Sequence, residues 1–433
     1  MVFRHAFVNF DHSKKKQMGV IYNLGILLFT LLVRLLSPFN TKARLWYNGR
    51  KNWAPLLKQK INPGDQYIWI HCASLGEFEQ GRPVIEMIKN ENPGYKIILT
   101  FFSPSGYEIR KNYSNADYVC YLPADTPGNA RKFISIISPL FVIFVKYEFW
   151  NNYISELYKK RTPLFLVSGM FRPGQHFFKC YGSFFRKMLF RFSHIFVQDK
   201  QSMDLLKEIG IKNVSVTGDT RFDRVVQIVG AAKDIPELEL FRGNEKIFLA
   251  GSSWEPDEKI IAKYINNHPD RMKWVFAPHE IDKSNIERLE KLFAVRVVRF
   301  SQLSEESAGA RVLIMDNMGM LSSAYRYAYL AAIGGGFGKG IHNILEPACW
   351  GIPVLFGPNF KKFREAIELI NKMGAKSFKS YEEFSLIVDN WLSDEEFYLK
   401  SANSAAIYVK QNTGATVKII AKITQKDINI HRS

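Results

Sequence analysis

Short apolar runs alternate with helical stretches over most of this 433-residue chain, and this alternation constrains the fold more than any other feature. Seven runs come first, at residues 67–71, 96–101, 118–122, 141–146, 163–168, 194–198 and 214–217. Six more follow, at 246–251, 273–277, 296–299, 311–315, 329–334 and 353–357. Near-continuous apolar strands separated by helices are typical of parallel sheets covered on both faces. The sequence therefore predicts an α/β protein with two doubly wound sheets.

The chain is long enough for two cores, since domains usually contain about 100–200 residues. We expect a first Rossmann-like domain over residues 61–224 and a second over 246–405, facing each other across a cleft. Residues 225–245 become polar toward their end and are predicted to form a linker. Residues 406–433 are expected to form a C-terminal helix and tail.

A hydrophobic segment near the N-terminus indicates contact with a membrane. Residues 17–33 carry no charge, and basic residues lie on both sides of them. This length is at the lower edge of what spans a bilayer, for which about 20 residues are usual. We expect residues 18–60 to form a membrane-associated segment whose helix lies on, or inserts shallowly into, an anionic leaflet. A buried core helix is the alternative, and Met18 is an alternative start that would make residues 1–17 a non-native extension.

The net charge of +18 predicts an anionic partner, such as nucleic acid, acidic lipid or a phosphorylated substrate. The sequence has no zinc-finger spacing, RNP-like motif or single basic helix, so we expect no nucleic-acid partner. Its four cysteines lack C-x-x-C spacing, which indicates a reducing compartment without a disulfide framework. General surface basicity is the alternative reading of the charge.

A glycine-rich turn follows the predicted strand at 329–334. Residues 334–347 read Gly-Gly-Gly-Phe-Gly-Lys-Gly-Ile-His-Asn-Ile-Leu-Glu-Pro. Backbone N–H groups in such a turn, at the start of a helix, bind phosphate groups. Asn343 is the expected N-cap, and Glu346 three residues later completes a pair that resembles a capping box. The pattern matches neither the dinucleotide fingerprint nor the P-loop, and a turn without a ligand is the alternative.

Other predicted strands of the first domain also end in polar residues. Glu77 follows one of them, and a carboxylate at that place suits a general base. Glu148 follows another, and Arg221 a third, where a guanidinium group neutralises a phosphate or an acidic sugar. The alternative for Glu77 is a first-turn residue stabilised by the helix dipole.

In the second domain, hydroxyl groups at Ser252 and Ser253 end one predicted strand, where they reach phosphate oxygens. Pro278 and His279 end the next strand. A surface or packing histidine is the alternative for His279.

Seven motifs, in this order, resemble the Kdo (3-deoxy-D-manno-octulosonic acid) transferase family, which has the GT-B glycosyltransferase fold. They occupy residues 71–77, 147–152, 218–223, 316–321, 342–347, 351–358 and 363–365. The resemblance runs from about Met18 to the last helices. It implies GT-B architecture, with two Rossmann-like domains and an N-terminal membrane-associated helix.

The resemblance also implies an activity. The chain would transfer Kdo from CMP-Kdo to a hydroxyl of a phosphorylated lipid A precursor, lipid IVA, with inversion and without a metal or other cofactor. This lipopolysaccharide synthesis would take place at the cytoplasmic side of the cell inner membrane. Glu77 would be the catalytic base, and Glu148 and Arg221 would stabilise the transition state.

The same family pattern implies the donor contacts. CMP would contact Pro278, His279, Met318, Gly319, Met320, Asn343, Ile344, Leu345 and Glu346. The strand-end serines and the glycine-rich turn add Ser252, Ser253 and Gly336 to this candidate donor site.

The chain departs from the family pattern at several positions. His279 stands where arginine is usual, Met320 where an acidic residue is common, and Ile341 where the second glycine of G-G-H-N is usual. Lys146 and Tyr147 replace the Glu-Thr pair before the motif glutamate. The alternatives are another GT-B nucleotide-sugar transferase or an epimerase, and a basic peripheral membrane-binding protein without catalysis.

Overall fold

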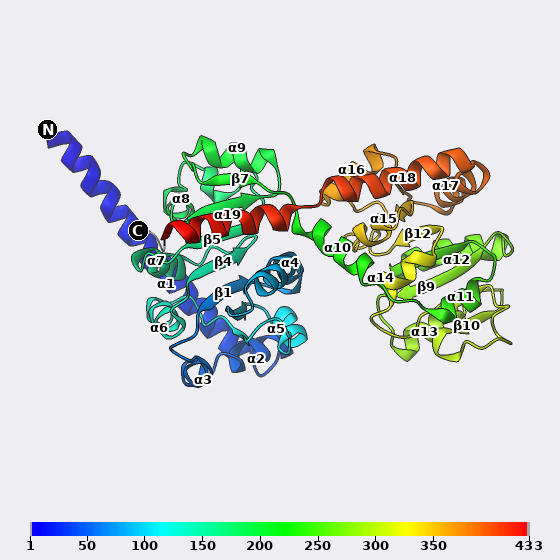
Figure 1. Ribbon diagram of the computed structural model, residues 1–433, viewed down its shortest axis with the longest axis horizontal. Helices are drawn as coiled ribbons and strands as arrows, with labels where there is room; N and C mark the ends of the chain where they lie inside the picture. The colour runs from blue at the N-terminus through cyan, green and yellow to red at the C-terminus, as the bar shows by residue number, and fades with distance from the viewer. Residues whose placement is uncertain (1, 431–433) are drawn as a thin grey trace. The chain divides into compact units, whose positions relative to one another are not determined.

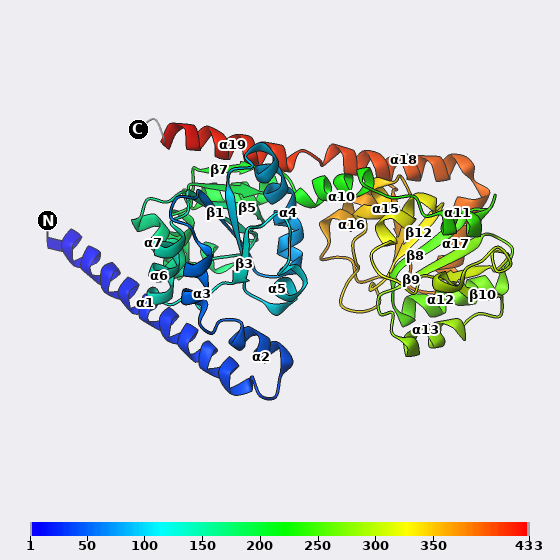
Figure 2. The same cartoon turned by 60° about the horizontal axis from the view of Figure 1, so that its bottom comes forward.

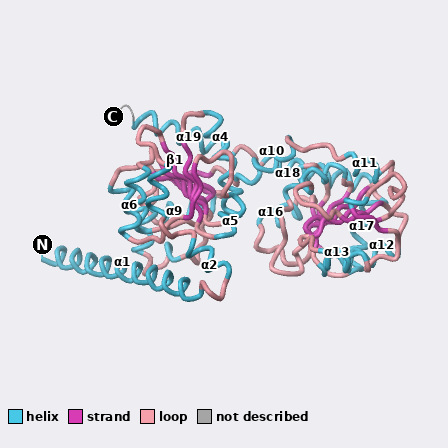
Figure 3. Tube along the Cα trace, turned by 90° about the horizontal axis from the view of Figure 1, so that it is seen from below, coloured by secondary structure: helices cyan, strands magenta, loops and turns pink. Residues whose placement is uncertain are grey.

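The computed structural model describes residues 2–430, and the side chains of residues 17–425. Residue contacts divide the chain into two compact units, Met1–Arg224 with Gly414–Ser433, and Val225–Thr413. Each unit is built on one seven-stranded parallel sheet, drawn in magenta in Figure 3 with helices on both sides. The predicted α/β class, with two Rossmann-like units and an N-terminal apolar helix, is confirmed.

The first sheet has the strand order β3-β2-β1-β4-β5-β6-β7; Figure 1 labels β1, β4, β5 and β7 of it. Its strands are β1 (Tyr67–Cys72), β2 (Lys96–Phe101), β3 (Tyr118–Tyr121), β4 (Phe141–Val145), β5 (Leu164–Gly169), β6 (His194–Val197) and β7 (Val214–Val216). The strand order reverses between β1 and β4, where Ile68 lies opposite Phe141. Ligands of open α/β sheets bind outside the carboxyl ends of the strands at such a switch point.

Helices cover both faces of the first sheet because successive side chains of each strand point to opposite faces. Ile68 and Ile70 pack with α4 and α19 on one face, whereas Trp69 packs with α6 and α7 on the other. The helices of this unit are α1 (Val2–Leu36), α2 (Thr41–Asn48), α3 (Trp53–Lys60), α4 (Leu75–Glu91), α5 (Pro104–Arg110), α6 (Pro127–Ile137), α7 (Asn151–Lys159), α8 (Ser183–Leu189), α9 (Lys200–Glu208), α19 (Ala415–Ile430) and the start of α10 (Thr220–Gly230).

The second sheet has the order β10-β11-β9-β8-β12-β13-β14. Its strands are β8 (Ile247–Ser253), β9 (Lys273–Pro278), β10 (Val297–Arg299), β11 (Val312–Ile314), β12 (Leu330–Ile333), β13 (Val354–Phe356) and β14 (Ala375–Ser377). Strand β14 was not predicted, because its three residues include a lysine and form no apolar run. The helices are α11 (Pro236–Arg242), α12 (Glu255–Asn267), α13 (Lys283–Glu290), α14 (Leu321–Ala324), α15 (Leu345–Cys349), α16 (Arg364–Asn371), α17 (Tyr381–Ser393) and α18 (Glu395–Gln411).

The predicted linker differs from its expected role, whereas the predicted C-terminal helix is present. Residues 225–245, expected as a linker, are part of the second unit, where Leu238 and Phe241 of α11 are fully buried. The last helix, α19, belongs to the first unit because Ile419 and Ile423 on one of its faces complete the core against α4. The end of the expected tail, residues 431–433, lies outside the described residues.

Helix α1 carries the apolar N-terminal segment, drawn in blue in Figure 2. Residues Gln17–Leu36 have a mean hydropathy of 2.0 and are 0% buried, so by length and composition they are able to cross a membrane. Leu27 and Leu28 are more than half exposed, which contradicts the alternative of a core helix. Signal sequences near the N-terminus meet the same criteria of length and composition.

Candidate active site

Polar residues gather at the carboxyl edge of each sheet. In the first unit Glu77 follows β1, Glu148 follows β4 and Arg221 follows β7. The switch point lies between β1 and β4, so the two glutamates follow the strands that flank it. The fold therefore places both predicted carboxylates where parallel α/β sheets bind ligands.

Glu77 lies in the first turn of α4, which begins after Ser74. The Ser74 hydroxyl donates a hydrogen bond to Glu77 Oε2, and the glutamate remains partly exposed. The helix N-terminus stabilises its negative charge. Burial raises the pKa of the Tyr147 hydroxyl. The positive charge of Arg172 lowers this pKa, and the negative charge of Glu77 raises it further. The side chain of Glu77 is thus held by Ser74 and remains accessible to a ligand, as suits a proton acceptor.

Glu148 is buried in a chain of hydrogen bonds. Its Oε2 atom lies 2.9 Å from His71 Nε2 and accepts a hydrogen bond of 2.6 Å from Trp150 Nε1. His71, which is fully buried in β1, also contacts the Thr100 hydroxyl through Nδ1 at 2.8 Å. The Thr100 hydroxyl in turn accepts a hydrogen bond of 2.8 Å from Trp69 Nε1. This network orients the carboxylate before any ligand arrives.

The sequence reasoning did not assign a role to His71 or Trp150 in orienting Glu148. The available signal was a histidine inside an otherwise apolar run, because a fully buried polar residue requires hydrogen-bond partners. Its partners became identifiable only when β1 and β4 were seen to pair.

Arg221 lies near the start of α10 and is held by Asp219. Its Nε and Nη2 atoms lie 2.9 Å and 2.7 Å from Asp219 Oδ2. The preceding residue, Thr220, is buried and donates a hydrogen bond of 2.6 Å to the Gln80 carbonyl of α4. The guanidinium group is therefore oriented by an ion pair at the start of α10, which is hydrogen-bonded to the same helix as Glu77.

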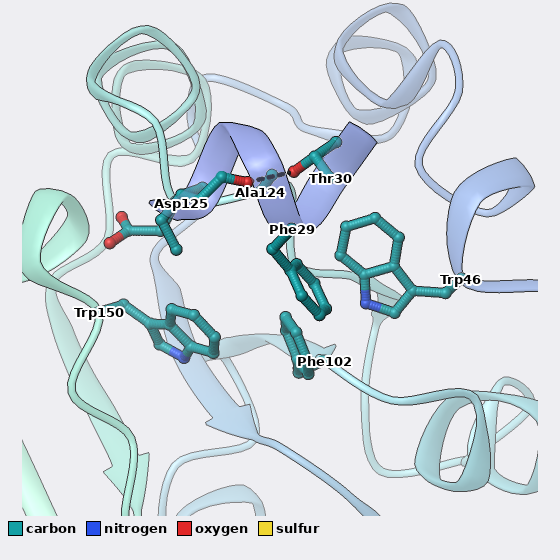
Figure 4. A pocket seen from close by; sticks show the side chains of 8 residues that line it. Phe29, Thr30, Trp46, Phe102, Ala124, Asp125 and Trp150 are labelled. Carbon is teal, nitrogen blue, oxygen red and sulfur yellow. Dashed lines mark hydrogen bonds between the residues drawn. The ribbon is translucent and has the colours of Figure 1, made fainter. Parts of the chain in front are cut away.

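An apolar cavity of about 260 Å³ adjoins this network (Figure 4). Phe29 of α1, Trp46 and Phe102 line it, and Phe102 stacks on Trp150 with ring centroids 4.9 Å apart. At one side Asp125 accepts hydrogen bonds from the Tyr22 hydroxyl and from the first residues of α7. Helix α1 is thus attached directly beside the Glu148 network.

In the second unit, Ser252 and Ser253 are the last residues of β8. Ser253 is buried, and its hydroxyl donates a hydrogen bond of 2.8 Å to Glu258 Oε1. Ser252 has a left-handed backbone with φ of 50°. The Ser253 hydroxyl therefore already has an internal partner, and the end of β8 is irregular, with a register shift between Gly251 and Ser253.

His279 belongs to a stack of three rings. Its ring stacks on both Trp254 and His342, with centroids 4.7 Å and 4.5 Å away, and those two rings lie side by side in nearly parallel planes. Trp254 Nε1 donates a hydrogen bond of 3.0 Å to His342 Nε2. Burial and the neighbouring His279 lower the pKa of His342, so its ring is neutral near pH 7. Pro278, the last residue of β9, carries His279 into this stack.

The glycine-rich turn is closed by backbone contacts. A Cβ atom on Gly336 would lie 2.6 Å from the Gly357 Cα atom, so the two backbones touch. Gly335 has φ of 90°, and its N–H donates a hydrogen bond of 3.1 Å to Asp257 Oδ2. Burial raises the pKa of Asp257 to about 6, although hydrogen bonds from Gly335 and Trp254 oppose this shift. The turn therefore needs glycine for space and for its backbone geometry.

The expected capping at Asn343 is wrong in detail. Helix α15 begins at Leu345 and has only five residues, and its N-cap is Ile344. Asn343 lies one residue earlier, where its Oδ1 accepts a hydrogen bond of 3.1 Å from Leu345 N. The difference arises because this local side-chain bond makes a turn before the helix starts. Ile344 and Leu345 are buried, so their side chains pack in the interior of the unit.

Glu346 connects two parts of the predicted donor site. Its Oε1 accepts a hydrogen bond of 2.9 Å from Asn343 Nδ2, and its Oε2 accepts one of 2.8 Å from the Ser322 hydroxyl. Ser322 belongs to α14, directly after the loop of Met318, Gly319 and Met320. Met318 is 83% exposed and Gly319 has φ of 92°, so this loop projects at the surface beside the turn.

No group of three or more His, Cys, Asp or Glu side chains that could hold a metal ion occurs among the described residues. The expectation of a reaction without a metal stays a prediction.

Comparison with known proteins shows which family the chain belongs to. A sequence profile described as 3-deoxy-D-manno-octulosonic-acid transferase (kdotransferase) matches residues 43–224. A 3-deoxy-D-manno-octulosonic acid transferase of Aquifex aeolicus is 30% identical over 328 residues, which are 74% of this chain and 84% of that protein. The chain belongs to the Kdo transferase family. A Haemophilus influenzae protein of the same name is 24% identical over 83% of this chain and 86% of its own.

A solved structure agrees with this fold. A UDP-GlcNAc 2-epimerase from Neisseria meningitidis, bound to UDP-GlcNAc, superposes with a TM-score of 0.59 at 15% identity, over 83% of this chain and 100% of that chain. At this identity the likeness concerns the fold alone. Membership of the Kdo transferase family makes the chain a glycosyltransferase of GT-B fold and sets aside the non-catalytic alternative.

Proposed function

We propose that this protein transfers Kdo from CMP-Kdo to a hydroxyl of a phosphorylated lipid A precursor, lipid IVA. The main support is the place of two family-motif carboxylates, Glu77 and Glu148, after the strands that flank the switch point of the first sheet. The identity of donor and acceptor rests on the resemblance of the motifs to the Kdo transferase family.

In the proposed mechanism, Glu77 takes the proton of the acceptor hydroxyl as that hydroxyl attacks the anomeric carbon of Kdo. The reaction inverts the configuration, and positive charge develops on the sugar ring in the transition state. Glu148, oriented by His71 and Trp150, supplies a fixed negative charge toward that ring. A preorganised charge stabilises a transition state without the cost of reorienting solvent.

The leaving CMP carries away a phosphate group, and its charge needs stabilisation. Backbone N–H groups of the glycine-rich turn and the Arg221 guanidinium are proposed to supply it without a metal ion. Glu346 and Asn343, which are hydrogen-bonded to each other, are proposed to hold the ribose and phosphate of CMP. The Pro278-His279 segment and the loop of Met318 are proposed to contact the rest of the nucleotide.

We also propose that α1 places the enzyme on the cytoplasmic side of the cell inner membrane, where a lipid acceptor is embedded. Its exposed leucines suit a bilayer, and the net charge of +18 suits an anionic leaflet.

The test is a transfer assay with full-length protein in detergent, freshly generated CMP-Kdo and lipid IVA, followed by mass spectrometry. We expect a product heavier by one or more Kdo units. UDP-sugars serve as competing donors, since another GT-B transferase or an epimerase would consume one of them. Consumption of a UDP-sugar, with CMP-Kdo untouched while a control enzyme is active, would overturn the proposal.

A further inference from the structure

A basic pocket opens at the carboxyl ends of β12, β13 and β14 in the second unit. Its volume is about 1000 Å³, which is large enough for a substrate-sized ligand. The pocket is named for its five lysines, Lys339, Lys361, Lys362, Lys376 and Lys379. They come from three loops and from strand β14, so the fold rather than a local run of charge gathers them.

The lysines of the basic pocket have no anionic partner of their own. None of the five forms an ion pair within the described part of the chain, whereas other lysines such as Lys89 and Lys259 do. One carboxylate, Glu383, also lines the pocket, and it accepts a hydrogen bond of 2.8 Å from the backbone N–H of Lys379. The pocket therefore carries a local excess of positive charge.

Like charges gathered in a concave site repel one another and concentrate the electrostatic potential there. An anion entering the pocket relieves this repulsion, and lysine ammonium groups bind phosphate as point charges. Pro358, Phe360 and Ile370 add apolar surface between the lysines. A ligand that carries phosphate on a sugar ring fits both properties, because the ring offers an apolar face and the phosphate offers the charge.

The basic pocket is joined to the glycine-rich turn. Asn359 donates a backbone hydrogen bond of 2.8 Å to the Gly336 carbonyl and a side-chain bond of 2.9 Å to the Gly338 carbonyl. Gly338 and Lys339 belong to that turn and also line the pocket. A ligand in the pocket would thus lie next to the turn that is proposed to hold CMP.

The proposed CMP contacts follow β8, β9, β11 and β12, whereas four of the five lysines follow or belong to β13 and β14. The pocket is therefore available to a second anion.

We propose that the basic pocket binds a sugar phosphate monoester and thereby contributes to recognition of the phosphorylated acceptor. This inference rests on the proposed function for the identity of that acceptor. An anionic phospholipid headgroup offers similar chemistry, and the experiment distinguishes the two sources.

The first experiment measures binding without turnover. Full-length protein in neutral detergent is titrated with glucosamine 1-phosphate and with inorganic phosphate by calorimetry. The variant K361Q/K362Q/K376Q removes three charges from the pocket, and K291Q/K400Q/K410Q removes three exposed charges of the same unit outside it. We expect the dissociation constant to rise at least about ten-fold in the pocket variant alone, because a charge-assisted contact is worth about a factor of ten. Equal weakening in both variants, or none, would overturn the proposal.

The second experiment separates the sources of phosphate. Transfer is measured with lipid IVA and with its enzymatically dephosphorylated form. We expect the pocket variant to raise KM for the phosphorylated acceptor about ten-fold and to leave KM for the dephosphorylated acceptor and for CMP-Kdo within two-fold. A rise in the KM for CMP-Kdo alone would overturn the assignment to the acceptor.

Flotation with vesicles of phosphatidylcholine, with and without phosphatidylglycerol, completes the test. The pocket variant could fail to float with anionic vesicles and still have an unchanged KM for the acceptor. That result would show that the pocket binds the bilayer, and it would overturn the role in acceptor recognition. Absence of any transfer by the wild-type protein would count against the proposed function instead. In that case the binding titration alone still decides whether the pocket takes phosphate.

Discussion

The carboxyl edges of the two sheets share a topology and differ in chemistry. At the first edge the important groups are side chains already bonded to one another, such as Glu148 with His71 and Trp150. At the second edge the central feature is backbone, because Gly336 touches Gly357 and leaves no room for a side chain. Exposed residues such as Met318 surround it.

The two edges suit two different chemical tasks on the same fold. Oriented carboxylates suit proton transfer and charge stabilisation, which gain from groups fixed before the reaction. Backbone N–H groups at a turn before a helix suit the binding of a phosphate-bearing ligand, and in this turn those of Gly334, Gly335 and Gly338 already donate within the unit. On this comparison, changes at the first edge should act on turnover, and changes at the second edge should act on nucleotide affinity.

The largest expected effect is that of Glu77→Ala on turnover. Loss of a general base lowers the rate by about 100- to 10,000-fold, while the CMP dissociation constant should stay within two-fold. Mass spectrometry of the product and calorimetry with CMP measure the two quantities. Glu79→Ala, on the same helix but paired with Arg110, is the matched control. Near-normal turnover by Glu77→Ala would contradict the assignment of the base.

The next effect concerns Asp257, which holds Gly335 of the glycine-rich turn. Burial raises the pKa of Asp257 from 3.8 to about 6, so the folded state holds a proton more tightly than the unfolded state. Its contribution to stability is therefore greatest below pH 4 and is lost as pH rises through about 6, by about 3 kcal/mol in total.

In Asp257→Asn this pH dependence should disappear. An amide oxygen can still accept both N–H bonds that Oδ2 accepts, from Gly335 and from Trp254. The free energy of unfolding of the variant relative to wild type should therefore increase between pH 4 and pH 7. Denaturant titrations at pH 4, 5, 6 and 7 measure it, and a constant difference across this range would argue against the raised pKa.

We expect Gly336→Ala to disrupt the carboxyl edge of the second sheet more than that of the first sheet. Its Cβ would lie 2.6 Å from Gly357 backbone atoms, which cannot give way without moving the turn. We expect a loss of about 1–3 kcal/mol in stability and about ten-fold weaker CMP binding. Gly309→Ala meets no atom within 4 Å and is the control. Equal thermal unfolding and equal CMP affinity in the two variants would show that the close approach is unimportant.

The smallest expected effect is a difference in stability between two variants, Asp125→Asn and Asp257→Asn. Asp125 uses both carboxylate oxygens, since Oδ1 accepts from Tyr153 N and Oδ2 from Asn152 N and the Tyr22 hydroxyl. An amide cannot satisfy both backbone donors, because one of its two positions is itself a donor. Asp125→Asn should therefore be about 1–3 kcal/mol less stable than Asp257→Asn at pH 7. Equal stability of the two variants in urea unfolding would contradict this account.

Strand positions were predictable because a buried parallel strand needs an apolar run, and every predicted run contains a strand. The missed strand, β14, is a short edge strand that pairs on one side only, so its sequence carries little of that signal. The start of α15 was predicted too early because Asn343 bonds the backbone in a turn and not as an N-cap. Side chains such as Glu77, which only had to follow a strand, were placed correctly at its end.

The two α/β units, the apolar N-terminal segment and the positions of the motifs along the chain are readable in the sequence, since they follow from local periodicity and spacing. Which polar groups meet depends on the fold. His71 contacts Glu148 because β1 pairs with β4, and five lysines line one pocket because three loops and strand β14 meet at one sheet edge. The physical reason is that these contacts join residues far apart in sequence, whose proximity depends on strand order and not on local pattern.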